Sequence, residues 1–254
     1  MRVLTIRSFS GQFGLILSVA CLNGCGSGAL ADTDWPVYLG PGSGQYSDLT
    51  QINPDNVRLL EVAWNYHAGD ADEENGRTQM QTSPIVVDGV LYGVSPVTKI
   101  FALDASNGKQ LWEFDPFDSG ATVPRNGTSR GVTYWTDGND RRVFATAGSK
   151  LFALDAMTGV SVESFGRDGA IDLHDGLEDG RDISNLSVIS NTPGVIFEDL
   201  LILPTRVSEG DPAAPGHIRA FDVRTGEVAW VFHTIPHPDE FGYDTWPADA
   251  WQRV

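Results

Sequence analysis

The pattern of apolar and polar positions is dominated by one motif that occurs three times. Apolar residues run into Ala-x-Asp, and three further residues separate this Asp from a Gly. In the first and third copies the residues after the Gly alternate between apolar and polar, which is the period of a strand and not of a helix. The pattern therefore predicts a β-hairpin in each copy. The copies read FALDASNGKQLW (101–112), LFALDAMTGVSVESF (151–165) and IRAFDVRTGEVAW (218–230).

The hairpins are expected to turn through the same chemistry each time. The Asp side chain can accept hydrogen bonds from nearby backbone amides, and the Gly can take the positive φ that such a turn requires. The Asp positions are 104, 155 and 222, and the Gly positions are 108, 159 and 226.

A second strand pair is expected upstream of each hairpin. Asp88-Gly89 is a strong two-residue turn signal, and Glu198-Asp199 holds the same place in the third copy. Four strands in each repeat predict an all-β propeller with blades at about 81–117, 131–165 and 190–232. Three blades cannot close a ring, so we expect part of a larger propeller with exposed edge strands.

Residues 1–31 are expected to form an export leader. Arg2 and Arg7 precede a short apolar stretch at 13–22, which is too short to span a membrane. Two processing sites remain open: a lipoprotein-type box ending at Cys25, which would carry a lipid anchor, and a signal-peptidase site ending at Ala31. Both cysteines lie in this leader, so residues 32–254 would contain no disulfide.

The net charge of the chain limits the kinds of molecule that it can bind. The formal charge of −17 argues against binding to nucleic acid, whose phosphates require a basic surface. The 28 Gly and 14 Pro agree with a turn-rich β protein.

Several unlike segments resemble one family in the right order along the chain. They are SDLTQINPDNVRLLEVAW (47–64), RNGTSRGVTYW (125–135), GHIRAFDVRTGEVAWVF (216–232) and YDTWPADAW (243–251). They are similar to the N-terminal part of the bacterial quinoprotein dehydrogenases that use pyrroloquinoline quinone (PQQ), in the branch that resembles glucose dehydrogenase. The resemblance implies an eight-bladed propeller in the periplasm, with 53–64 forming a short helix and then a strand.

The resemblance also implies the chemistry. Family members oxidise a sugar or an alcohol with PQQ and Ca²⁺ and pass electrons to a respiratory quinone or cytochrome c. PQQ is a planar quinone with three carboxylates, so its site needs cationic and hydroxyl donors. The resemblance places the catalytic base outside this chain. It assigns PQQ contacts to Arg130, Ser190 and Thr205, and a metal ligand to Glu209. Two further candidate PQQ contacts depart from the family pattern: Asn126 stands where glucose dehydrogenases have a cofactor-proximal His, and Gln81 stands where some relatives have a cofactor-contacting Glu. Gln81 could equally be a packing residue of an inner strand.

Other features predict less. A cofactor-free propeller lipoprotein that acts as an outer-membrane assembly or binding scaffold would share the same repeats, and this alternative stays open. His233 and His237 form an H-x3-H pair, but Pro236 and Pro238 prevent a helix from presenting both histidines to a metal. The acidic run at 168–182 lacks the ligand order of a calcium loop, so we expect a solvated loop there.

Overall fold

The computed structural model describes residues 34–117, 128–177 and 180–253. The expected leader, with Cys25, and the predicted PQQ contact Asn126 lie outside these ranges. No helix in the described part of the chain has the length and apolar character needed to cross a bilayer.

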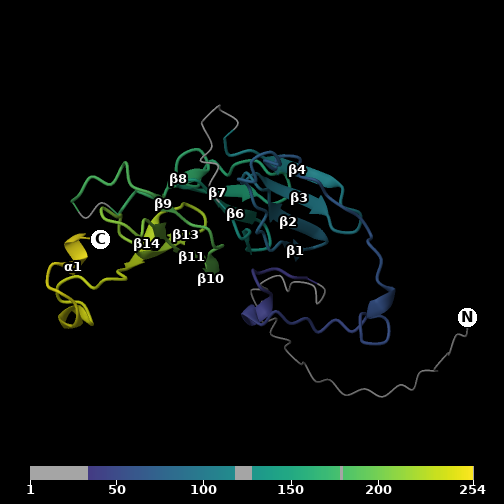
Figure 1. The fold of residues 1–254 in the computed structure, drawn as a ribbon, viewed down its shortest axis with the longest axis horizontal. Helices are drawn as coiled ribbons and strands as arrows, with labels where there is room; N and C mark the ends of the chain where they lie inside the picture. Colours follow the sequence, from purple (N-terminus) through teal and green to yellow (C-terminus); the bar gives the residue numbers. More distant parts are fainter. Residues whose placement is uncertain (1–33, 118–127, 178–179, 254) are drawn as a thin grey trace, which may run out of the picture.

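Three four-stranded antiparallel sheets follow one another along the chain and form adjacent blades (Figure 1). The all-β prediction is therefore confirmed. The first blade contains β1 (Ile85–Val87), β2 (Val90–Val94), β3 (Ile100–Asp104) and β4 (Gln110–Phe114); the second contains β5 (Thr133–Thr136), β6 (Arg141–Ala147), β7 (Lys150–Asp155) and β8 (Ala170–Asp172); the third contains β10 (Val195–Phe197), β11 (Leu200–Pro204), β13 (Ile218–Asp222) and β14 (Val228–Phe232).

The remaining elements are short. A two-stranded ladder joins β9 (Val188–Ile189) to β12 (Arg206–Val207). The 3₁₀ helices are η1 (Pro41–Ser43), η2 (Val57–Leu59) and η3 (Tyr243–Thr245), and the α-helix α1 (Ala250–Arg253) comes last.

The turns follow the predicted local chemistry. Asp88 and Gly89 connect β1 to β2 with φ values of 51° and 76°, as a tight two-residue hairpin requires. Asp104 accepts the Ser106 amide at 2.9 Å, and Gly108 takes a φ of 73°. The same carboxylate–amide contact recurs at the Asp of the other two hairpins.

The second repeat departs from the prediction. Its expected returning strand at 160–165 does not form, and only Ser161 bridges back to Leu154. The chain instead turns through positive φ values at Gly166, Asp168 and Gly169, so that the outermost strand is β8. The prediction of a strand directly after the Gly was therefore wrong in this copy.

Two further expectations need correction. Residues 60–66 belong to no strand, although the resemblance implied a strand after the helix. The acidic run is more than a solvated loop: it contains β8, and Leu173 and Leu177 are fully buried. Apolar side chains inside the acidic sequence anchor it against the second and third blades.

The core lies between neighbouring blades. One apolar cluster joins the first and second blades, and another joins the second and third. Trp112 of the first blade lies over Gly159 of the second, and its Nε1 donates to the carbonyl of Ala156 at 3.0 Å. Trp64 covers Gly108 in the same way. Each such glycine leaves the space that the indole occupies.

This contact predicts a specific loss of stability. A Cβ on Gly159 would approach the Trp112 ring to 2.6 Å, whereas Gly69 has the same φ of 72° with open space around it. We expect Gly159→Ala to lower the free energy of unfolding by about 1 to 2 kcal/mol more than Gly69→Ala, because only the first substitution displaces the ring. Urea unfolding of both variants measures the difference, and equal losses would contradict the role of the indole contact.

Candidate functional site

The entry segments of the three blades meet at one end of the structure. The amide of Ser83, before the first blade, donates to the carbonyl of Arg130 at 2.9 Å. The amide of Arg130, before the second blade, donates in turn to the carbonyl of Asn191 at 2.8 Å. These backbone bonds fix the position of Arg130 between its neighbours.

Ser190 and Thr205 come together through the short β9–β12 ladder. Ile189 pairs with Arg206, which places Ser190 opposite Thr205. Ser190 is buried: its hydroxyl donates to the carbonyl of Thr192 at 3.2 Å, and its own carbonyl accepts the hydroxyl of Thr146 at 2.6 Å. The structure therefore brings two of the predicted hydroxyl donors together. Ser190 directly precedes Asn191, whose carbonyl accepts the Arg130 amide.

Arg130 and Gln81 are the exposed polar side chains among the predicted PQQ contacts at this end. The Arg130 guanidinium is exposed, and its Nη1 donates to the hydroxyl of Thr192 at 3.4 Å, a long hydrogen bond. Gln81 is also exposed and donates to the Gln79 side chain at 2.8 Å. Both side chains can therefore turn to a ligand without leaving a buried group unpaired.

A pocket of about 220 Å³ adjoins these segments, because its lining includes Ser129, which precedes Arg130, and Asn191, whose carbonyl accepts the Arg130 amide. Most of its lining residues carry a hydroxyl group, and none is acidic. Such a wall presents no negative charge to an anion, while the hydroxyls of Ser129, Thr146 and Ser190 already donate to backbone carbonyls. The hydroxyl residues are Thr98, Thr128, Ser129, Thr146, Ser149, Ser187 and Ser190.

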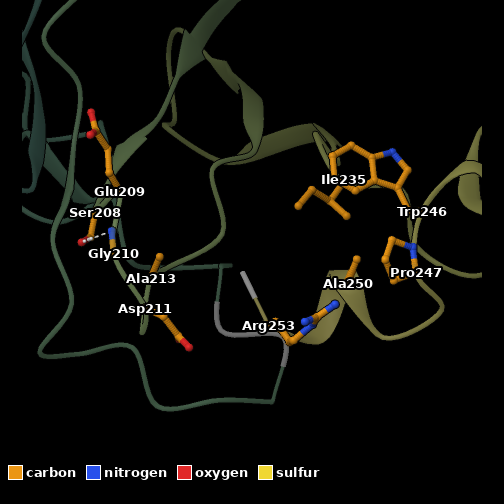
Figure 2. A pocket seen from close by; sticks show the side chains of 10 residues that line it. All are labelled: Ser208, Glu209, Gly210, Asp211, Ala213, Ile235, Trp246, Pro247, Ala250 and Arg253. Atoms are coloured by element: carbon orange, nitrogen blue, oxygen red, sulfur yellow. Dashed lines mark hydrogen bonds between the residues drawn. The ribbon is translucent and has the colours of Figure 1, made fainter.

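Glu209 lies apart from this pocket, in the loop after β12. It lines a second pocket of about 410 Å³ together with Asp211, Trp246 and Arg253. Figure 2 shows the Glu209 carboxylate directed away from Trp246 and Arg253. Glu209 belongs to no group of three His, Cys, Asp or Glu side chains close enough to share an ion within the described ranges. One carboxylate does not make a calcium site, so further ligands would have to come from elsewhere.

The structure corrects the reading of the H-x3-H pair. No helix presents His233 and His237, but the loop after β14 stacks their rings with centroids 3.7 Å apart. His217, which sequence reasoning missed, completes a cluster whose ligand atoms lie within 4.8 Å of one another. The signal was available in the hairpin: if β13 and β14 pair, the residues just outside their ends face each other.

The chain is similar to known proteins over most of its length. The family model described as "Glucose/ethanol/alcohol dehydrogenase, beta-propeller domain", of the PQQ type, matches residues 35–254. The quinoprotein glucose dehydrogenase of Escherichia coli K12 is 31% identical over 220 residues, which cover 80% of this chain and 27% of that protein.

Alcohol dehydrogenases show a comparable similarity. The dehydrogenase subunit of the quinone-dependent enzyme of Gluconobacter oxydans 621H is 35% identical over 81% of this chain and 25% of that protein. The crystal structure of the quinohemoprotein alcohol dehydrogenase of Comamonas testosteroni superposes with a TM-score of 0.60 and 26% identity, over 80% of this chain and 28% of that one. The chain thus spans about a quarter of the length of these relatives.

Proposed function

The chain belongs to the glucose/ethanol/alcohol dehydrogenase family of PQQ β-propellers, and from this membership we propose that it supplies three blades and one wall of the PQQ site in an exported dehydrogenase. The substrate class is a sugar or an alcohol, as the names of its relatives suggest. A respiratory quinone or cytochrome c is the proposed electron acceptor. The carrying observation is the convergence of Arg130, Ser190 and Thr205 at one end of adjacent blades.

The residues present suit a planar molecule with three carboxylates. Arg130 offers a guanidinium fork that can pair with one carboxylate through two parallel hydrogen bonds. Ser190 and Thr205 add hydroxyl donors, and Gln81 places a neutral amide where a carboxylate would repel the ligand. We propose that these four residues hold PQQ and that Asn126 contributes from the neighbouring segment outside the described ranges.

The chemistry divides between the cofactor and the chain. When bound, PQQ supplies the oxidising quinone, which takes up the hydride that leaves the substrate. The residues of this chain orient the cofactor by its carboxylates, and Glu209 supplies one oxygen ligand toward Ca²⁺, a cation that prefers carboxylate and carbonyl oxygens. The base that removes the substrate proton is proposed to lie in blades beyond these three.

The outer surface of the third blade supports a longer propeller. Trp64 and Trp112 each cover a glycine of the next blade, and Trp230 occupies the place equivalent to Trp112, in the middle of β14. Trp230 is 41% exposed, and Val228 and Phe232 on the same strand are exposed as well. A fourth blade with a glycine at the matching turn would bury them.

The test of this function is cofactor binding followed by turnover. In the whole protein that carries these blades, added PQQ should quench tryptophan fluorescence in a saturable way, and Ca²⁺ should strengthen this binding. The reconstituted protein should reduce a redox dye with glucose or ethanol as substrate. Saturable binding without turnover on any sugar or alcohol would reject the substrate class, and no PQQ binding would reject the cofactor.

Export by the lipoprotein route makes a separate prediction. We propose periplasmic localisation with a lipid anchor at Cys25, since the leader combines basic residues, a short apolar stretch and a cysteine box. Labelled palmitate should enter the wild-type protein and be lost completely in Cys25→Ser. A soluble periplasmic product cleaved after Ala31, without label in either protein, would show that the other processing site is used.

A further inference from the structure

The β13–β14 hairpin brings two histidines together at its open end. Ile218 at the start of β13 pairs with Phe232 at the end of β14, so His217 and His233 lie opposite each other just outside the strands. Their ring centroids are 4.6 Å apart. This end of the third blade lies next to the C-terminal segment in Figure 1.

The loop that follows β14 adds a third histidine. The amide of His237 donates to Glu240 Oε2 at 2.8 Å, and the carbonyl of His237 accepts the Glu240 amide at 3.1 Å. This tight turn holds the His237 ring against His233 on one side, and Trp251 of α1 lies 4.8 Å from it. Three imidazoles, one from just before β13 and two from the loop after β14, therefore lie together.

Glu240 also orients the second histidine. Its Oε1 lies 2.7 Å from Nδ1 of His233, which leaves Nε2 of that ring available to a ligand. A carboxylate bonded to the far nitrogen of a ligating imidazole is the usual support of a metal-binding histidine, because it fixes the tautomer and orients the ring.

We propose that His217, His233 and His237 bind one divalent transition-metal ion of the Zn²⁺ class. Three neutral imidazole nitrogens suit such ions, whereas Ca²⁺ and Mg²⁺ prefer oxygen. The site is independent of the PQQ function and of Glu209, which belongs to a different loop. A pocket of about 200 Å³, lined by His217, Thr234 and Trp251, adjoins the cluster and gives the ion a path and room for a fourth ligand such as water.

Binding requires a small rearrangement of the rings. Tetrahedral coordination at about 2.0 to 2.1 Å brings ligand nitrogens to roughly 3.3 Å from one another, and the cluster now extends to 4.8 Å. The rings of His233 and His237 are parallel to within 8°, so their in-plane lone pairs do not yet converge. Rotation of the His237 ring about χ2, a soft torsion, can open the stack without moving the backbone and without disturbing the contact of His233 with Glu240.

The rival explanation is that the three rings only pack the C-terminal segment onto the hairpin. The experiment uses the untagged protein with Cys21 and Cys25 changed to Ser, so that thiols do not compete, and titrates Zn²⁺ against a chromophoric chelator. We expect one Zn²⁺ per chain, undisturbed by excess Ca²⁺. His237→Ala should weaken binding at least 10-fold, and Glu240→Gln should weaken it about 10- to 100-fold while all three ligands remain.

His67→Ala is the matched control, because His67 lies outside the cluster and its removal should leave the affinity unchanged. His217 is buried, so the Zn²⁺ affinity of His217→Ala is interpreted only if the near-ultraviolet circular dichroism of this variant matches that of the wild type. The Glu240 variant keeps the test valid if that protein misfolds. Zn²⁺ affinity that is absent in the wild type, or equal in His237→Ala, Glu240→Gln and the control, would overturn the proposal.

Discussion

Replacing Arg219 with Met should destabilise the protein by about 2 to 5 kcal/mol, because two backbone carbonyls would lose their donor. Its side chain is 1% exposed and reaches from β13 of the third blade into the acidic run. Nη2 donates to the carbonyl of Leu173 at 2.7 Å, and Nη1 donates to the carbonyl of Asp175 at 2.8 Å. Met keeps much of the volume but leaves both carbonyls without these charged donors.

The loss should appear both globally and locally. Urea unfolding gives the change in the free energy of unfolding, and hydrogen exchange gives the protection of the Leu173 amide, which bonds to the carbonyl of Ser149 at 2.7 Å. Arg167→Met is the control, because that exposed arginine lies in the same segment and should cost less than about 0.5 kcal/mol. Similar losses in the two variants would show that Arg219 does not anchor the run.

Local turn chemistry explains why the repeats could be predicted from the sequence. Asp88-Gly89 and the three Asp-Gly hairpins specify their own backbone geometry over a few residues, and the register of each pair follows from the turn. The first and third blades accordingly form as expected. Each hairpin depends on contacts between residues that are at most about ten positions apart, so a local sequence pattern predicts it.

The second repeat shows where this reasoning fails. Its sequence lacks the Trp after Gly159, and the outer strand is displaced to β8 beyond Gly166 and Gly169. Phe165 and Ile171 then cover Gly226 of the third blade, where the other interfaces use an indole. Which side chain covers the glycine depends on packing between blades. This packing cannot be predicted from a local sequence pattern.

The histidine cluster was missed for a related reason. The spacing of His233 and His237 predicts a shared metal only on a helix, and the flanking prolines exclude a helix. The structure joins them in a loop and adds His217 through a strand pairing across the hairpin. A site assembled from loops and strand ends depends on tertiary arrangement, so the H-x3-H spacing alone could not identify it.

The candidate PQQ site could be predicted from the sequence only in part. The positions of Arg130, Ser190 and Thr205 at one end follow from blade topology, because equivalent segments of neighbouring blades adjoin. Their roles toward the cofactor came from the resemblance and remain predictions. Glu209 adjoins Asp211 in its pocket but forms no cluster of ligands within the described ranges, so its proposed role as a calcium ligand requires further ligands from elsewhere.

Arg130→Ala should weaken PQQ binding by about 2 to 5 kcal/mol, because one cofactor carboxylate would lose its guanidinium partner in a partly desolvated site. That loss corresponds to roughly 30- to 5000-fold in affinity. Arg130→Lys keeps the charge but not the two-pronged geometry, so its affinity should lie between wild type and Ala. Stability should change little, since the side chain is exposed and its one bond, to Thr192, is long.

Glu209→Gln separates anchoring of the cofactor from binding of the metal. It keeps the shape of the side chain and removes one negative charge from the proposed calcium site, so raised Ca²⁺ should partly restore activity. Arg130→Ala should respond to added PQQ and not to Ca²⁺, because its defect lies in carboxylate pairing. Dye reduction by the whole reconstituted protein, titrated with each component, tests both variants against Arg58→Ala, an exposed arginine in η2. Wild-type dependence on PQQ and Ca²⁺ in both variants would remove Arg130 and Glu209 from the site, even if the protein proves to be a PQQ enzyme.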